Sequence, residues 1–234
     1  MEKKNASFLL NECRVGVEAL ESRLPKSLDA MVISQISKLP WKTLLFRESL
    51  SWRIAELARS ALESFENDKL VAGITLARAA VETTAALWYL GDKVAVAVES
   101  NIVGDIDDHL MKLGMGIATN PPDTAFPRPV KVSAFLKAIE KDLPGFSKQY
   151  GMLSEYAHPN WHGTGLLYCK HDVEQRTTEF GHNFRIAENT KVIGLGNLSV
   201  ALLLFERSYT RIANLIPAFT VLCEERLRWA SAAD

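Results

Sequence analysis

The segment that decides the fold is residues 69–90, which read KLVAGITLARAAVETTAALWYL. Its apolar residues leave hardly any polar face when the segment is built as a helix. The only polar residues between Gly73 and Tyr89 are Thr75, Arg78, Glu82, Thr83 and Thr84. A helix that is apolar nearly all round is packed by neighbours on most of its sides. The segment therefore predicts a central helix, which we expect to end at Gly91-Asp92.

Amphipathic patterns on both sides of this segment predict further helices. Apolar residues recur there at intervals of three and four, the spacing of one helical face. The predicted helices span residues 6–24, 27–37 and 41–65 before the central helix, and residues 92–118, 132–143, 146–157 and 191–229 after it. Pro217 should kink or divide the last of them. Residues 119–130 contain four prolines and are predicted to form a surface loop.

The stretch from residue 164 to residue 190 has a different texture. Leu166–Cys169 and Thr177–Phe180 are short β-compatible runs separated by polar residues, which predicts a β-hairpin or a loop excursion. The predicted fold class is therefore all-α. We expect a single domain, residues 1–234, built as a bundle of about seven helices with a small hairpin-like or irregular insertion before the long C-terminal helix.

Composition narrows the classes of function. Lysine plus arginine (27) nearly balance aspartate plus glutamate (28), so net charge gives no support to RNA binding, which would need a local basic patch. The three cysteines, Cys13, Cys169 and Cys223, are odd in number and far apart, which favours a reducing cytoplasm over a disulfide framework. The longest uncharged apolar run, residues 212–223, is shorter than the roughly 20 residues that span a bilayer. We expect a cytoplasmic protein with no membrane partner and no cofactor.

Two charged residues of the central helix form the first candidate site. Arg78 and Glu82 lie four residues apart and so share a helical face. An unpaired charge on a central helix is costly, so each must find a partner: the other residue, a further polar group or a ligand. Two interpretations stay open. The pair is either a structural ion pair that fixes helix register, or a site in which Glu82 acts as a base or ligand and Arg78 holds it ionised or holds an anion.

Residues 150–163, YGMLSEYAHPNWHG, form the second candidate site. Pro159 disfavours a helical conformation at His158, so the preceding helix should end there. His158 is then either a helix cap or a general base or hydrogen-bond donor, with Tyr156 or Asn160 nearby.

The turn that follows His158 supplies candidate ligand-binding residues. These are Asn160, Trp161 and His162, and Trp161 has packing as its alternative role. Two histidines four apart bind zinc from one continuous helix, which Pro159 interrupts here, so no metal is predicted. The alternative left open is a site of His158, His162 and Glu82.

The two candidate segments together carry a family resemblance. Residues 76–83 read LARAAVET and residues 153–159 read LSEYAHP. This combination resembles a group of bacterial all-helical proteins that looks like a distant branch of the HEPN-like helical bundles, over roughly residues 41–163. The resemblance implies homodimerisation through helices, with Arg78, Glu82 and His158 as its signature positions.

The same resemblance bears on activity. In well-studied HEPN members, an arginine and a histidine a few residues apart at the dimer interface cut RNA. That spacing occurs here at Arg176 and His182, within the predicted hairpin. We therefore expect a helical binding or interaction module that homodimerises. The alternative is a HEPN-like ribonuclease or another hydrolase that uses Arg78, Glu82 and His158 with Tyr156.

Overall fold

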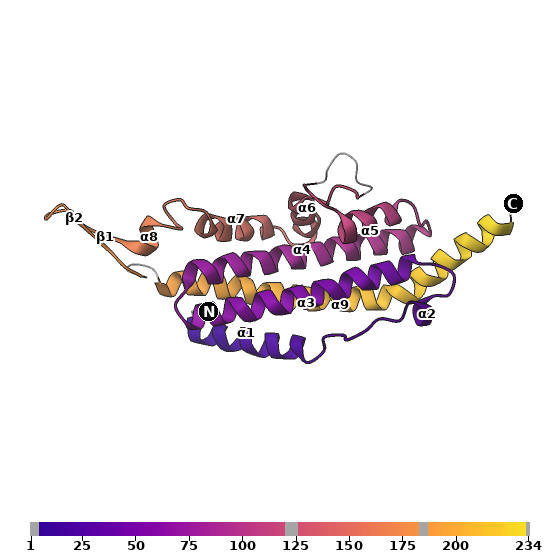
Figure 1. The fold of residues 1–234 in the computed structure, drawn as a ribbon, viewed down its shortest axis with the longest axis horizontal. Helices are drawn as coiled ribbons and strands as arrows, with labels where there is room; N and C mark the ends of the chain where they lie inside the picture. The colour runs from indigo at the N-terminus through magenta and orange to yellow at the C-terminus, as the bar shows by residue number, and fades with distance from the viewer. Residues whose placement is uncertain (1–4, 120–125, 183–186, 233–234) are drawn as a thin grey trace. The chain divides into compact units, whose positions relative to one another are not determined.

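The computed structural model describes residues 5–119, 126–182 and 187–232 (Figure 1). These ranges contain nine helices and one two-stranded sheet, which confirms the predicted all-α fold. The helices are α1 Ala6–Glu21, α2 Ala30–Ile33, α3 Leu39–Glu66, α4 Leu70–Ser100, α5 Ile106–Met115, α6 Val132–Asp142, α7 Phe146–Ala157, α8 Gly165–Tyr168 and α9 Ala187–Ala232. The strands are β1 Cys169–Asp172 and β2 Thr177–Phe180.

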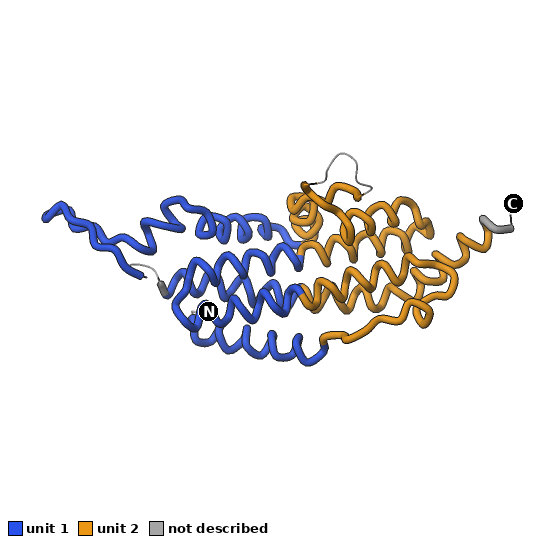
Figure 2. The backbone as a smooth tube through the Cα atoms, viewed as in Figure 1, with its two compact units in different colours: residues 1–23, 53–84, 143–204 blue, residues 24–52, 85–142, 205–234 orange. Residues whose placement is uncertain are grey.

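Two compact units divide the chain (Figure 2). Unit 1 comprises residues 1–23, 53–84 and 143–204, and unit 2 comprises residues 24–52, 85–142 and 205–234. The boundaries fall inside α3, α4 and α9, so each of these three helices contributes one segment to each unit. The single domain expected from the sequence stays a prediction.

Phe65 of α3 is completely buried in unit 1, where its ring lies against two glycines of neighbouring helices. A Cβ atom at Gly73 of α4 would lie 2.7 Å from the ring, and one at Gly194 of α9 would lie 2.3 Å from it. Carbon atoms that are not bonded to each other settle about 3.5–4.0 Å apart, so neither position has room for a side chain. This contact therefore fixes how α3, α4 and α9 approach one another in unit 1.

The N-terminal helix α1 completes the core of unit 1. Its buried residues are Ala6, Leu9, Cys13, Val17 and Leu20, the three- and four-residue steps that the sequence predicts. The side chain of Asn5 accepts a hydrogen bond from the Phe8 amide and so caps the helix. At the other end, Arg59 of α3 donates to both carboxylate oxygens of Glu21. The ion pair anchors the point where the chain leaves α1.

The central helix is longer than the sequence suggests, and the prediction that it ends at Gly91-Asp92 is wrong. In unit 2, α4 continues to Ser100 because both residues are accommodated by α9. A Cβ atom at Gly91 would lie 3.5 Å from Ile212, and Asp92 forms an ion pair of 2.6 Å with Arg211. The predicted helix over residues 92–118 is accordingly replaced by the end of α4, a turn with positive φ at Asn101 and Gly104, and α5.

The length of α4 raises the question of a membrane span. Among the described helices, α4 alone is long and apolar enough to cross a bilayer, but 61% of its most apolar window is buried inside the protein. A buried core helix passes the same test, so this finding is weak evidence for a membrane.

The predicted hairpin is present, with one correction to its first strand. β2 coincides with the predicted run Thr177–Phe180, whereas residues 165–168 form the helical turn α8 and β1 starts only at Cys169. The turn forms because Leu167 is completely buried and its amide donates to Thr164. The strands are antiparallel and Cys169 pairs with Phe180.

Three other sequence predictions need adjustment. The helix expected over residues 27–37 is a single turn, α2, which Asp29 caps. Pro217 does not divide α9. Because proline has no N–H, the carbonyl oxygen of Ala213 loses its helical hydrogen bond, but Ala213 is exposed and water can bond to it instead. Of the predicted loop 119–130, residues 126–130 are irregular and residues 120–125 lie outside the described residues.

Two glycines on one helix give a matched test of this packing. We expect Gly194→Ala to lower the free energy of unfolding by about 1–3 kcal/mol, because the new methyl group collides with Phe65. Gly196→Ala should be neutral or stabilise by up to about 1 kcal/mol, because its Cβ meets no atom within 4 Å and alanine favours the helix. Urea unfolding followed by circular dichroism measures both. Equal effects of the two substitutions would contradict the packing at Phe65.

Candidate functional site

A cluster of four polar side chains joins α4 to α7 in unit 1. Arg78 and Glu82 lie one turn apart on α4, and Tyr150 and Ser154 lie one turn apart on α7. Arg78 donates from Nε to Ser154 Oγ at 3.0 Å and from Nη2 to the Tyr150 hydroxyl at 2.5 Å. The Tyr150 hydroxyl in turn donates to Glu82 Oε1 at 2.6 Å. We call these four residues the Arg78–Tyr150 cluster.

The Arg78–Tyr150 cluster is an ion pair bridged by a phenol. Arg78 Nη2 and Glu82 Oε1 are 3.3 Å apart, and their side chains are 29% and 25% exposed. The Arg78 guanidinium also lies 4.9 Å from the centre of the Tyr150 ring. Burial raises the pKa of the Tyr150 hydroxyl above its ordinary value, and the hydrogen bond to Glu82 raises it further. Tyr150 therefore stays protonated and serves as a donor rather than as a base.

Ser154 has no group that would activate it as a nucleophile. Its Oγ accepts from Arg78 and donates its own proton to the backbone oxygen of Tyr150, at 3.0 Å. An activated serine instead gives its proton to a basic side chain. The role of Ser154 here is to orient the guanidinium of Arg78.

Tyr156 and His158 lie on the same helix as Tyr150 but are not bonded to the cluster. Tyr156 is buried and packs edge-on against the His162 ring, with 5.5 Å between ring centres. His158 ends α7 in an extended conformation, as Pro159 predicts, and its backbone amide donates to Ser154. Its exposed imidazole has no hydrogen bond or ion pair with any other described residue. The structure thus brings Arg78 and Glu82 together with Tyr150 and Ser154, and leaves His158 at the surface.

Asn160, Trp161 and His162 build the turn that follows α7. Asn160 accepts from the amides of His162 and Gly163 through Oδ1, and it donates to Glu155 through Nδ2. A Cβ atom at Gly163 would lie 2.0 Å from the oxygen of His158, so the turn requires glycine there.

The Trp161 ring has two neighbours in this part of unit 1. It covers Gly165 and stacks on the His171 ring of the hairpin, with ring centres 6.3 Å apart. Trp161 is nevertheless 52% exposed, so part of the ring packs and part faces solvent. Within residues 5–119, 126–182 and 187–232, no group of three or more His, Cys, Asp or Glu residues is arranged to hold a metal ion.

A cavity of about 320 Å³ opens on the surface of unit 1 between α4, α7 and α9. It is lined by Val81 of α4, by Phe146 and Gln149 of α7, and by Gly196, Asn197 and Val200 of α9. Val81 and Gln149 are the sequence neighbours of Glu82 and Tyr150, so the two helices that carry the Arg78–Tyr150 cluster also line the cavity. No lining residue is charged. The sequence pattern missed this cavity because its residues come from three separate helices.

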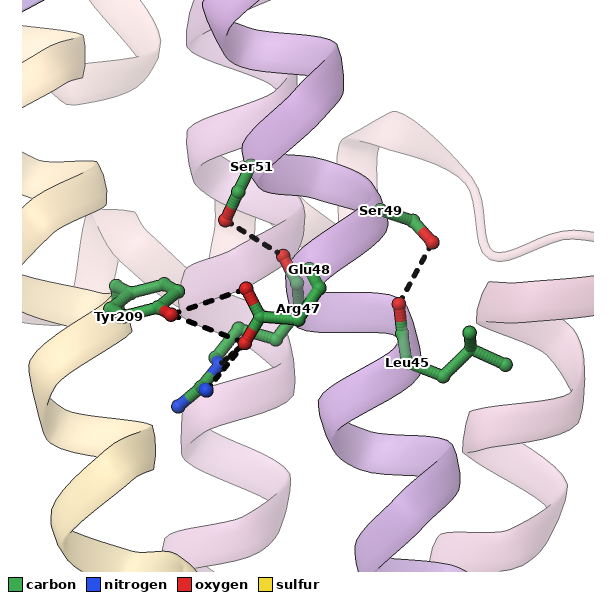
Figure 3. A network of polar contacts seen from close by, with 6 residues as sticks. All are labelled: Leu45, Arg47, Glu48, Ser49, Ser51 and Tyr209. Atoms are coloured by element: carbon green, nitrogen blue, oxygen red, sulfur yellow. Dashed lines mark hydrogen bonds and ion pairs between the residues drawn. The ribbon is translucent and has the colours of Figure 1, made fainter. Parts of the chain in front are cut away.

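Unit 2 contains a buried charged network that the sequence pattern did not single out (Figure 3). Arg47 and Glu48 are adjacent on α3 and are only 9% and 8% exposed. Adjacent side chains on a helix do not normally face each other, yet here Arg47 folds back onto Glu48 with two hydrogen bonds. Tyr209 of α9 donates to the Glu48 carboxylate and lies beneath the guanidinium. The network ties α3 to α9, and its charges are neutralised by each other.

A second cluster in unit 2 links α4, α5 and α6 through a histidine. The Tyr89 hydroxyl lies 3.1 Å from His109 Nδ1, and His109 Nε2 lies 3.3 Å from the Asp105 carboxylate. Because Nε2 faces a carboxylate, the ring proton belongs there, and Nδ1 accepts from Tyr89. Phe135 of α6 packs edge-on against Tyr89.

Charges around His109 act in both directions. Burial lowers the pKa of the imidazole, and Lys93 and Lys112 lower it further, whereas Asp105 and Asp108 raise it. The balance favours the neutral ring in the folded protein.

The Tyr150 hydroxyl gives a direct test of the bridge in unit 1. We expect Tyr150→Phe to lower the free energy of unfolding by about 1–2 kcal/mol, because Arg78 and Glu82 each lose a partner. The matched control is Tyr168→Phe, since the Tyr168 hydroxyl bonds to no described residue, and its effect should stay below about 0.5 kcal/mol. Urea unfolding of both variants measures these changes. Equal losses of unfolding free energy in the two variants would show that the Tyr150 bridge is not a stabilising contact.

Acid should weaken unit 2 through His109. Below pH 6.5, the ordinary pKa of histidine, the unfolded chain takes up a proton that the folded cluster disfavours. The free energy of unfolding should therefore fall as the pH is lowered from 6.5 through the depressed pKa of His109. We expect His109→Gln, which keeps an acceptor for Tyr89 without titrating, to lose less stability in acid than the wild type. His171→Gln, which removes an exposed imidazole, should behave like the wild type.

Comparison with known proteins does not assign the chain to a family. No protein-family model, no curated protein and no solved structure matches the chain. The HEPN-like resemblance and the bacterial origin that it implies therefore stay predictions.

Proposed function

We propose that the protein is a helical binding and interaction module that works as a homodimer, with its binding site on unit 1. One observation carries this proposal. The polar side chains that join α4 to α7 are bonded to one another, while the same two helices and α9 line an open surface cavity of about 320 Å³ with no charged residue. The polar cluster thus holds the walls of a binding site together.

Hydrolysis would need different chemistry at the same place. A general base must come within about 2.6–3.2 Å of the proton that it removes. In the Arg78–Tyr150 cluster, the proton of Ser154 is directed at a backbone oxygen, and the raised pKa of Tyr150 keeps its hydroxyl protonated. His158, the base of the ribonuclease alternative, has no bond to Arg78 or Glu82. These features favour binding over cleavage.

Exposed apolar side chains on α9 support self-association. In unit 1, Leu203 is 70% exposed, and in unit 2 Val221 and Trp229 are also exposed. Contiguous exposed apolar patches, rather than single exposed residues, mark protein interfaces, and two-fold dimers are the commonest assembly. The free thiols Cys13, Cys169 and Cys223 fit the reducing cytoplasm that we propose as its location.

Incubation with total RNA tests the proposal against its alternative. We expect wild type and His158→Ala to leave the RNA equally intact, because the His158 imidazole has no hydrogen bond or ion pair with a described residue. Light scattering of the same wild-type sample should give about twice the chain mass of 26.0 kDa, as a homodimer requires. RNA cleavage that the wild type performs and His158→Ala loses would contradict the binding function. A mass equal to one chain would contradict the homodimer.

A further inference from the structure

We infer that the cavity of unit 1 binds a small neutral molecule that combines an apolar body with a hydrogen-bond donor, an inference that rests on the proposed binding function. Its volume, about 320 Å³, falls in the range of roughly 300–1,000 Å³ that is typical of small-molecule sites. Three of its lining side chains, Val81, Phe146 and Val200, are apolar. They provide the contact surface for the apolar body.

Two carboxamides supply the polar contacts of the cavity. Asn197 uses its Nδ2 to donate to the backbone oxygen of Ile193 at 2.9 Å. Its Oδ1 has no partner among the described residues, and the carboxamide of Gln149 has none there either. Asn197 Oδ1 can only accept, because it is a carbonyl oxygen and carries no proton. A ligand that satisfies it must bring an N–H or O–H group.

The carboxylate next to the cavity lining is already engaged. Glu82, next to Val81 in the sequence, accepts from Tyr150 and pairs with Arg78. A charged ligand would lose part of its hydration against the apolar lining without gaining an opposite charge from any lining residue. The cavity therefore selects neutral molecules.

Gly196 keeps the cavity open. Glycine within a helix costs stability relative to alanine, and at Gly194 the nearby Phe65 ring explains the choice. No such neighbour exists at Gly196, where a Cβ atom would meet nothing within 4 Å. A side chain at this position would project into empty space at the cavity wall. Gly196 is thus the position at which the cavity can be filled without disturbing the core.

The test uses a matched pair of small probes on the 234-residue chain. 2-Phenylacetamide is neutral and has an aromatic ring and N–H donors, whereas phenylacetate has nearly the same shape and a negative charge. We expect 2-phenylacetamide to shift the NMR signals of Gly196 and of the Asn197 and Gln149 carboxamides, with phenylacetate binding at least about tenfold more weakly. Gly196→Leu should weaken 2-phenylacetamide binding at least about tenfold by filling the cavity.

Gly151→Leu is the control for the substitution. Gly151 lies on α7, its Cβ would also meet nothing within 4 Å, and it does not line the cavity, so binding should be unchanged. If phenylacetate binds as tightly as 2-phenylacetamide and Gly196→Leu weakens the binding of both, the ligand is not restricted to neutral molecules. That result would leave the binding function standing. If neither probe shifts the NMR signals of Gly196, Asn197 and Gln149, the proposed ligand class and the proposed binding site are both wrong.

Discussion

The contact of Phe65 with Gly73 and Gly194 sets the rotation of two helices, and the candidate site depends on that rotation. Residues of an α-helix advance by about 100° each, so Glu82 lies about 180° round α4 from Gly73, and Gly196 lies about 200° round α9 from Gly194. Both residues therefore face away from Phe65. On α4 that far side carries Glu82, to which α7 supplies Tyr150, and on α9 it carries Gly196, which lines the cavity. The packing contact at Phe65 thus determines which side chains of α4 and α9 face the candidate site.

Both units hold charged residues by the same chemical device, a tyrosine hydroxyl donated to a carboxylate that also pairs with an arginine. Unit 1 uses Tyr150 with the Arg78 and Glu82 pair, and unit 2 uses Tyr209 with Arg47 and Glu48. In each case the phenol comes from a different helix than the charges, so satisfying the carboxylate also joins two helices. The arrangement stabilises helix pairing in each unit.

Local sequence pattern predicted the helices but not the contacts that extend or connect them. Apolar spacing located α1, α3 and α7, and Pro159 correctly predicted that α7 ends before His158. Gly91-Asp92 looked like a stop signal because its local propensity is poor. The packing partners that overrule it, Ile212 and Arg211, lie more than a hundred residues away and leave no trace in the local pattern. Similarly, the need of Arg78 and Glu82 for partners was predictable, whereas the identity of Tyr150 required the fold.

The hairpin of β1 and β2 differs in kind from the rest of the described chain. Seven of its eight strand residues are exposed, and each strand pairs only with the other. Although His171 stacks on Trp161, most of the hairpin is unpacked, and a two-stranded hairpin of this kind is marginally stable in water. Its backbone amides can therefore open and exchange with solvent at low free-energy cost, without any loosening of the Phe65 core. The chain thus has a segment whose order can change while the helices that form the cavity keep theirs.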